Sequence, residues 1–183
     1  MSHSRKVIVH IAASADGYIA RSDGDLEWLT SRPAPPGFYG MNAFMKSIDT
    51  LILGRNTYEA SLRLGAKFDD GNRTIVFTRR GPPADAPPSV EFLSADINSF
   101  VRHLREEPGR NIWLMGGGKL IAAFLDAGVI DEFVVSVVPV FIGDGIPLIA
   151  RRHRLESLRL RSAEPFDDGL VQLHYEVQTA RPR

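Results

Sequence analysis

Runs of apolar, largely β-branched residues recur along this chain, and most of them lead directly into a turn and a helix-like pattern. The first run, KVIVHIAAS at residues 6–14, is apolar at nearly every position, which is typical of a strand buried on both faces. Similar runs occupy residues 50–54, 73–78, 90–94 and 111–116. Strands that alternate with helices favour a mostly parallel sheet with helices on both faces. The sequence therefore predicts a three-layer α/β/α fold.

Helix patterns fill most of the gaps between these strands. Asp96 is a good N-cap for a helix that Pro108 and Gly109 would end. Near the end of the chain, LVQLHYEV alternates between apolar and polar residues, which predicts a half-exposed antiparallel strand with residues 155–162 as its partner. A long strand is expected over residues 131–143. The expected helices span residues 38–48, 55–64, 97–107 and 119–128.

Composition limits the function classes. The 183 residues include 22 Lys and Arg, 22 Asp and Glu, and no cysteine. Zero net charge argues against a nucleic-acid or membrane-surface role, and the lack of cysteine excludes disulfides and thiolate chemistry. No histidine spacing suggests a metal site, and the first apolar run lacks the cleavage region of a signal peptide. We expect a single domain over residues 1–183, with the cytoplasm as the default location.

Three consecutive glycines interrupt the segment NIWLMGGGKLIAAFL between a strand and a helix. Glycine allows positive φ and close approach of another group, and the start of a helix offers unpaired N–H groups that bind phosphate. The spacing matches neither G-x-G-x-x-G nor a Walker loop. A phosphate site and a plain strand-to-helix turn therefore remain equally good explanations of Gly116, Gly117 and Gly118.

Two further strand ends favour the phosphate site. In LILGRNTYE, Gly54 ends a strand, Arg55 adds a cation, and Asn56 or Thr57 could cap the helix that follows. In IVFTRR, two arginines follow a strand, although an arginine pair is usually only a solvated edge. The ends of parallel strands can line one crevice, and several phosphates along a crevice describe a dinucleotide.

The segments LILGRNTYE, TIVFTRR and IWLMGGGKLIAAFL, in this order and spacing, resemble the dihydrofolate reductase-like superfamily. The segments SADGYIA (14–20) and VIDEFVVSVVPVFIGDGIPLI (129–149) are more similar to the reductase domain of the bifunctional riboflavin-biosynthesis deaminase–reductase. The resemblance extends from about Val7 to Val177. It implies a central mixed, mostly parallel sheet of about eight strands and an NADPH site at the strand ends.

The resemblance also assigns residues to the cofactor pyrophosphate. Gly116–Leu120 would surround it, with a cis peptide bond between Gly116 and Gly117. Gly54–Thr57 would hold the phosphates from the other side. This assignment would explain why three glycines follow one another.

The remaining cofactor groups take residues from three other segments. The resemblance places Thr78–Arg80 near the adenosine 2′-phosphate, and Ala12, Ala13 and Ile19 beside the nicotinamide. Trp28 matches the tryptophan of a mobile loop over the active site, although a partly buried loop anchor is an equally good explanation. The expected cofactor-binding residues are Ala12, Ala13, Ile19, Gly54, Arg55, Asn56, Thr57, Thr78, Arg79, Arg80, Gly116, Gly117, Gly118, Lys119 and Leu120.

The substrate side departs from the family pattern. Dihydrofolate reductases carry a carboxylate in the helix before the G-R-x-T turn, and the corresponding position falls at about Phe38, next to Tyr39. Neither is an acid, so the catalytic residue stays open, with Asp16, Glu27 and Tyr39 as candidates. Asp16 also suits a plain Asp-Gly turn, and loop acids such as Glu27 are usually just solvated. Loose candidates for a substrate phosphate are Arg32 and Arg63.

These observations predict an NADPH-dependent reductase of a small heterocyclic substrate, resembling 5-amino-6-(5-phosphoribosylamino)uracil reductase of riboflavin biosynthesis. The alternatives are dihydrofolate reductase activity, or a dinucleotide-binding protein without efficient catalysis. No metal is expected. Apolar residues in FVVSVVPVFIG and in the C-terminal strands further predict a homodimer.

Overall fold

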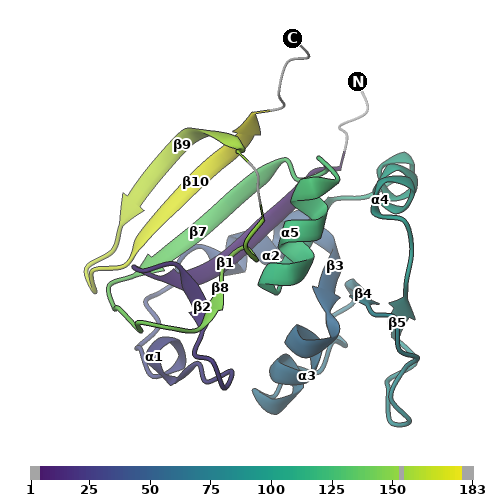
Figure 1. Ribbon diagram of the computed structural model, residues 1–183, viewed down its shortest axis with the longest axis horizontal. Coiled ribbons are helices and arrows are strands. Elements are labelled where there is room, and N and C mark those ends of the chain that lie inside the picture. The colour runs from purple at the N-terminus through teal and green to yellow at the C-terminus, as the bar shows by residue number, and fades with distance from the viewer. Residues whose placement is uncertain (1–4, 153–154, 179–183) are drawn as a thin grey trace.

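Eight strands form the central sheet of the fold, which Figure 1 shows as a computed structural model. The structure describes residues 5–152 and 155–178. The strands of this sheet are β1 (Val7–Ser14), β3 (Ile48–Gly54), β4 (Arg73–Phe77), β5 (Val90–Leu93), β6 (Asn111–Gly116), β7 (Glu132–Val138), β9 (Ser157–Pro165) and β10 (Val171–Gln178).

The strand order across the sheet is β5-β4-β3-β6-β1-β7-β10-β9. Neighbouring strands from β5 to β7 are parallel, whereas β10 is antiparallel to both β7 and β9. The predicted parallel sheet with an antiparallel end is therefore confirmed. A separate two-stranded sheet pairs β2 (Tyr18–Ala20) with β8 (Ile146–Pro147).

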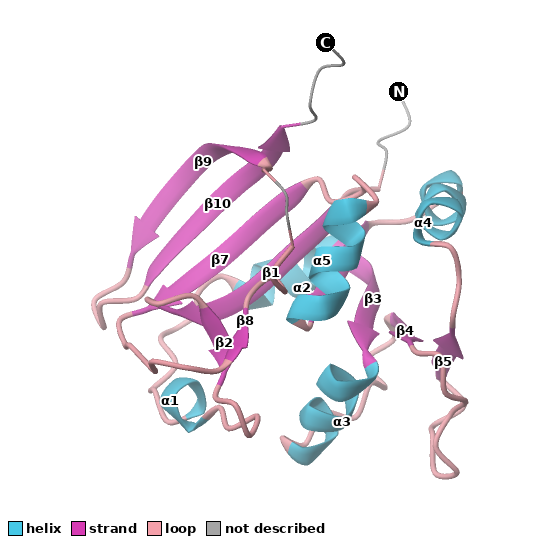
Figure 2. Ribbon diagram, in the orientation of Figure 1, coloured by secondary structure: helices cyan, strands magenta, loops and turns pink. Residues whose placement is uncertain are grey.

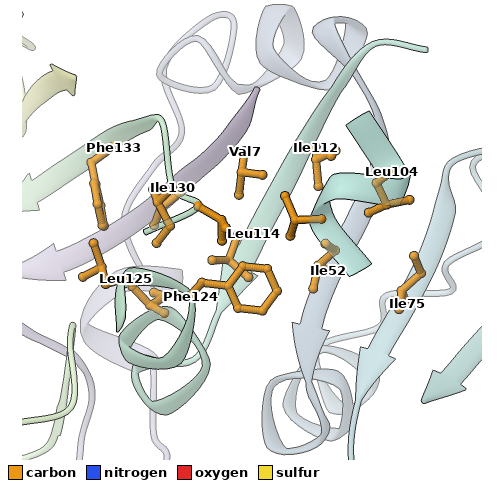
Figure 3. Packing of buried hydrophobic residues seen from close by; sticks show 14 residues of the cluster. Val7, Ile52, Ile75, Leu104, Ile112, Leu114, Phe124, Leu125, Ile130 and Phe133 are labelled. Atoms are coloured by element: carbon orange, nitrogen blue, oxygen red, sulfur yellow. The ribbon is translucent and has the colours of Figure 1, made fainter. Parts of the chain in front are cut away.

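Helices cover both faces of the sheet, as the α/β/α prediction requires (Figure 2). Helices α4 (Ile97–Glu106) and α5 (Gly118–Asp126) pack on one face, where Phe124 lies fully buried among Val7, Leu114 and their neighbours (Figure 3). Helices α2 (Met41–Ser47) and α3 (Arg55–Arg63) pack on the other face around Tyr58 and Trp113. Within the described residues, none of the helices combines the length and hydropathy needed to cross a membrane.

The predicted Asp96 cap is confirmed, because its side chain accepts a hydrogen bond of 2.9 Å from the Ser99 backbone N–H at the start of α4. The predicted helix over residues 38–48 was too long. Phe38 and Tyr39 have φ of 52° and 53°, outside the right-handed helical region, and α2 begins only at Met41.

Two other segments differ from the prediction. The strand expected over residues 131–143 ends at Val138, because Pro139 follows and cannot donate to a strand neighbour. A short helix that the sequence did not suggest, α1, spans Glu27–Thr30. It lies in the segment between β2 and α2, residues 21–40, which passes the carboxyl end of β1 (Figure 1).

Candidate cofactor and substrate site

The glycine turns after β3 and β6 lie side by side at the carboxyl edge of the sheet. Leu53 of β3 is paired with Gly116 of β6, and Gly54 is paired with Phe77 of β4. A methyl group on Gly54 would lie 3.6 Å from the Gly116 carbonyl oxygen. Strand pairing therefore brings together three turns that are far apart in the sequence, as the crevice hypothesis requires.

Each of the three consecutive glycines has its own structural reason. Gly116 has φ of 111°, which side chains strongly disfavour, and its peptide bond to Gly117 is cis, as the resemblance implies. A methyl group on Gly117 would lie 3.2 Å from Thr57 Oγ1 and 3.6 Å from Ile19 Cδ1. A methyl group on Gly118 would lie only 2.2 Å from the Pro147 carbonyl oxygen. Contacts within the protein therefore account for much of the need for glycine at residues 116–118.

The starts of α3 and α5 face this turn without side-chain caps. Gly54 and Gly117 are the N-cap residues, and neither helix start has a side-chain cap hydrogen bond. The expectation that Asn56 or Thr57 caps α3 was wrong, because both lie inside the helix. Uncapped first-turn N–H groups and the positive end of the helix dipole favour a bound anion.

The arginine side chains near the turn differ in whether they already have partners. Arg55 Nε donates to Glu59 Oε1 at 2.8 Å, and Arg55 Nη1 donates to the Gly81 carbonyl at 2.7 Å, so this arginine joins α3 to the loop after β4. Arg79 and Arg80 are exposed on the same loop, and within the described residues neither side chain has a hydrogen bond or ion pair. Their charges, with that of exposed Lys119 on the first turn of α5, are available to a ligand at this edge.

The other expected cofactor residues lie around the same turns. Thr78 N–H donates to Leu93, and Thr78 Oγ1 accepts from Arg80 N–H, so Thr78 shapes the loop that carries the arginines. Ile19 reaches Gly117 from β2. Ala12 is half-buried and Ala13 is buried at the end of β1. Lys119 is exposed and Leu120 half-buried on the first turn of α5.

The proton-donor candidates lie apart from one another. The Asp16 carboxylate accepts from Ser14 Oγ at 2.6 Å and from Gly143 N–H at 2.8 Å, and these hydrogen bonds, led by that of Ser14, lower its pKa. Asp16 thus fixes the turn after β7. Glu27 is exposed at the start of α1, and Trp28 next to it has its indole N–H buried without a partner among the described residues.

Asp168 joins Tyr39 to Arg32. The Tyr39 hydroxyl donates to Asp168 Oδ2 at 2.6 Å, and Arg32 Nη2 donates to the same oxygen at 2.7 Å. These two hydrogen bonds lower the pKa of Asp168 to about 2, and the bond to the carboxylate raises the pKa of Tyr39. Because the folded pKa of Asp168 is depressed, this cluster is intact at neutral pH and is lost only as the pH falls toward 2. Arg32 is already paired, while Arg63 is exposed at the last residue of α3.

The turn before α2 is unusual in its backbone. Gly37, Phe38, Tyr39 and Gly40 all have positive φ. The left-handed conformation costs roughly 1–2 kcal/mol for each residue that carries a side chain. The hydrogen bond to Asp168 and a second one, from Gln172 Nε2 to the Tyr39 carbonyl, hold this turn in place. Strained backbone of this kind often occurs at binding sites.

Sequence reasoning missed four polar residues near this turn. Gln172 Nε2 lies 3.1 Å from Ser136 Oγ and 3.4 Å from His10 Nε2. Burial lowers the pKa of His10 to about 4, helped by the nearby charge of His174, so the imidazole is neutral at pH 7. Asp168 lies in the turn segment FDDG at residues 166–169, which indicates only a turn. The other three lie in strands whose residue patterns do not single them out. The missed residues are His10, Ser136, Asp168 and Gln172.

Comparison with known families identifies what the chain is similar to. The family model described as RibD C-terminal domain matches residues 5–172. The uncharacterized protein YwjB of Bacillus subtilis (strain 168) is 37% identical over 171 residues, covering 93% of this chain and 97% of that protein. Riboflavin biosynthesis protein RibD of Corynebacterium ammoniagenes is 27% identical over 157 residues, covering 79% of this chain and 46% of RibD.

Solved structures give the same picture. A protein from Shewanella sp. PV-4, whose name suggests a role in riboflavin biosynthesis, superimposes with a TM-score of 0.84 at 29% identity, covering 95% of this chain and 99% of that one. Dihydrofolate reductase from Enterococcus faecalis, in complex with NADP(H), gives a TM-score of 0.68 at 16% identity, covering 95% of this chain and 97% of that one. The latter likeness shows that the fold is dihydrofolate reductase-like.

Proposed function

Because this chain belongs to the RibD C-terminal domain family, we propose that it is an NADPH-dependent reductase of a small heterocyclic substrate. The observation that carries the proposal is the pair of uncapped helix starts, α3 and α5, that face one glycine turn. Such a site suits a pyrophosphate. Gly54–Thr57 and Gly116–Leu120 would hold it, and the bound cofactor would supply the hydride.

The remaining roles follow from position. Arg79 and Arg80 are exposed cations on the loop next to the uncapped starts, which suits the 2′-phosphate of NADPH. Ala12, Ala13 and Ile19 would border the nicotinamide, because they lie at the end of β1 and beside Gly117. These small and apolar side chains would leave room for a flat ring and exclude water from it.

For the substrate we propose a pyrimidine related to that of 5-amino-6-(5-phosphoribosylamino)uracil reductase, a name carried by a structurally similar bifunctional enzyme from Thermotoga maritima. The Arg32 side chain, one of the two phosphate candidates, is already paired with Asp168. A substrate without a phosphate is therefore as suitable as one with it. NADPH oxidation measured across a panel of pyrimidines, pterins and small carbonyl compounds tests the proposal, and a panel without turnover would favour a cofactor-binding protein.

Replacing Gly117 with alanine should weaken NADPH binding by about tenfold while leaving the fold largely intact. The new methyl group would press on Thr57 Oγ1 at 3.2 Å, in the middle of the proposed phosphate site. Gly81→Ala is a matched control, since a methyl group there meets nothing within 4 Å. Fluorescence titration with NADPH and a thermal melt of each variant give the two readouts. Unchanged NADPH affinity in Gly117→Ala would show that the glycines serve only the turn.

Replacing both Arg79 and Arg80 with alanine should remove most of the preference for NADPH over NADH. A charged hydrogen bond to the 2′-phosphate contributes about 1.5–3 kcal/mol, which is roughly tenfold or more in affinity. NADH binding should change little, because NADH lacks that phosphate. Competition titrations with both cofactors measure the ratio, with Arg63→Ala as a control. Equal losses for NADPH and NADH would move the role to Arg55.

We also propose a homodimer, on one of the two grounds that the sequence offered, the C-terminal strands. The apolar segment of β7 is not a free edge, since β7 lies between β1 and β10. The edge strand on this side of the sheet is β9, where every residue is exposed. Leu158 of this strand, 45% exposed, borders a groove of about 550 Å³ that Val135, Leu173 and Tyr175 also line. A second copy could cover both features.

Sedimentation velocity at micromolar concentration should show a dimer of the unmodified protein. Changing Leu158 and Leu160 to aspartate should produce a monomer, because both side chains are about half-exposed on β9. Ser162→Asp, on the same strand, adds a comparable charge without removing an apolar side chain. A monomeric parent protein would contradict this proposal without affecting the proposed reaction.

A further inference from the structure

Ala12, Ser136 and Gln172 form one row across three neighbouring strands. Ala12 of β1 is paired with Ser136 of β7, which is paired with Gln172 of β10. Residues opposite one another in a sheet direct their side chains to the same face. Ala12 is one of the residues proposed to border the nicotinamide, so the two polar side chains of this row lie next to the place where a substrate ring would stack.

Hydrogen bonds fix how the Gln172 amide is turned. Its nitrogen lies 3.0 Å from the Tyr39 carbonyl oxygen, which can only accept, so the nitrogen and not the oxygen must face Tyr39. The same nitrogen lies 3.1 Å from Ser136 Oγ. The two amide protons are thus directed to the Tyr39 carbonyl and to the Ser136 hydroxyl oxygen. His10 Nε2 also lies 3.4 Å from this nitrogen, a longer contact than the other two, and the neutral ring adds no charge.

Within the described residues, one hydrogen-bond donor of Ser136 and one acceptor of Gln172 then have no partner. Ser136 accepts from Gln172, so its own hydroxyl proton is free, and the described residues offer it no acceptor. Gln172 Oε1 likewise has no donor in the described part of the chain, and it is not among the buried atoms that lack a partner, so it remains accessible. A buried or half-buried donor and acceptor without partners cost free energy, and a ligand that supplies both partners recovers it.

We propose that Ser136 and Gln172 bind the lactam edge of the substrate ring, the N–H and C=O groups that stand side by side in a pyrimidinedione. The Ser136 hydroxyl donates to the ring carbonyl, and Gln172 Oε1 accepts from the ring N–H. The inference rests on the proposed function, because it places the ring beside the nicotinamide. Both protein groups are uncharged, so the pair selects a neutral lactam, whereas a carboxylate at this place would favour a protonated ring.

The test uses two compounds that differ only at the lactam nitrogens. 5,6-Diaminouracil carries both ring N–H groups, and 5,6-diamino-1,3-dimethyluracil keeps both carbonyls but has no ring N–H. Calorimetric titration into the protein saturated with NADP⁺ should show at least about tenfold tighter binding of 5,6-diaminouracil. Gln172→Leu should bring this ratio close to one, because it removes the acceptor for the ring N–H. Ser136→Ala removes the donor to a carbonyl that both compounds keep, so it should weaken the binding of both by about twofold to tenfold and leave the ratio. NADP⁺ affinity should be unchanged in both variants. Ser162→Ala on the exposed edge strand is the matched control and should keep both affinities and therefore the ratio.

Four results would overturn the inference: equal affinity of the unmodified protein for the two compounds, no binding of either, a ratio that persists in Gln172→Leu, or unchanged affinities for both compounds in Ser136→Ala. The comparison of the two compounds uses the unmodified protein, so it decides even if Gln172→Leu does not fold. The titrations are repeated without cofactor. If the protein does not bind NADP⁺ but still binds 5,6-diaminouracil more tightly than the dimethyl compound, the proposed reductase activity is refuted and the lactam site is not.

Discussion

Replacing Gly118 with alanine should destabilise the fold by about 3 kcal/mol, near the upper end for an inserted methyl group in a well-packed site. The new methyl carbon would lie 2.2 Å from the Pro147 carbonyl oxygen and 3.1 Å from that of Leu148. Both neighbours are backbone atoms. The segment cannot move aside easily, because Leu148 N–H bonds to Gly17 and Ala150 N–H bonds to Gly118 itself.

Urea unfolding of the parent, Gly118→Ala and Gly117→Ala separates fold from binding. Gly117→Ala should unfold close to the parent, since its methyl group meets only two side-chain atoms, at 3.2 and 3.6 Å. Gly118→Ala should unfold at much lower urea. Equal stability of Gly118→Ala and the parent would mean that residues 147–148 pack more loosely against α5 than the structure shows.

Dihydrofolate should be reduced about 10²- to 10⁴-fold more slowly by this protein than by a true dihydrofolate reductase, the range typical for loss of general acid–base help. No acid stands at Phe38 or Tyr39. The acid that reaches this turn, Asp168, is bonded to Tyr39 and Arg32, and its pKa of about 2 leaves it without a proton to donate at neutral pH.

The measurement is steady-state turnover of dihydrofolate with NADPH in the parent and in Phe38→Asp. Phe38 is 51% exposed and has φ of 52°, a conformation that aspartate tolerates better than most residues, so the substitution should not harm the fold. A gain of activity in Phe38→Asp alone would support the argument. Turnover by the parent at the rate of a true dihydrofolate reductase would refute it.

The strands could be predicted because each is a continuous apolar run whose local pattern has one plausible structure. β1, β3, β4 and β6 lie where the sequence placed them, within a residue or two. The start of α2 could not be predicted in the same way. Phe38 has the spacing of a helical apolar face, but the backbone before Met41 is held left-handed by Asp168 and Gln172, both more than 100 residues away in sequence.

The candidate site likewise has one part that could be predicted from the sequence and one part that could not. Its glycine turns carry a local signal, since a strand, glycines and a helix follow one another within a few residues. The row of Ala12, Ser136 and Gln172 carries none, because it exists only through the pairing of three strands. The sequence did not explain all three glycines. Residue 118 must lack a side chain because the Pro147 carbonyl lies against it, a contact that no local pattern reveals.

The Asp168 carboxylate fixes both ends of a short stretch of chain, Arg32 on one side and Tyr39 on the other. The six residues between them, 33–38, begin and end at one point of the molecule and are mostly exposed. For such a closed loop, each doubling of length costs only about 0.6 kcal/mol in closure entropy. Relatives can therefore lengthen or shorten this stretch, and evolution can reshape the rim of the proposed substrate site there, while Tyr39 and the start of α2 keep their places.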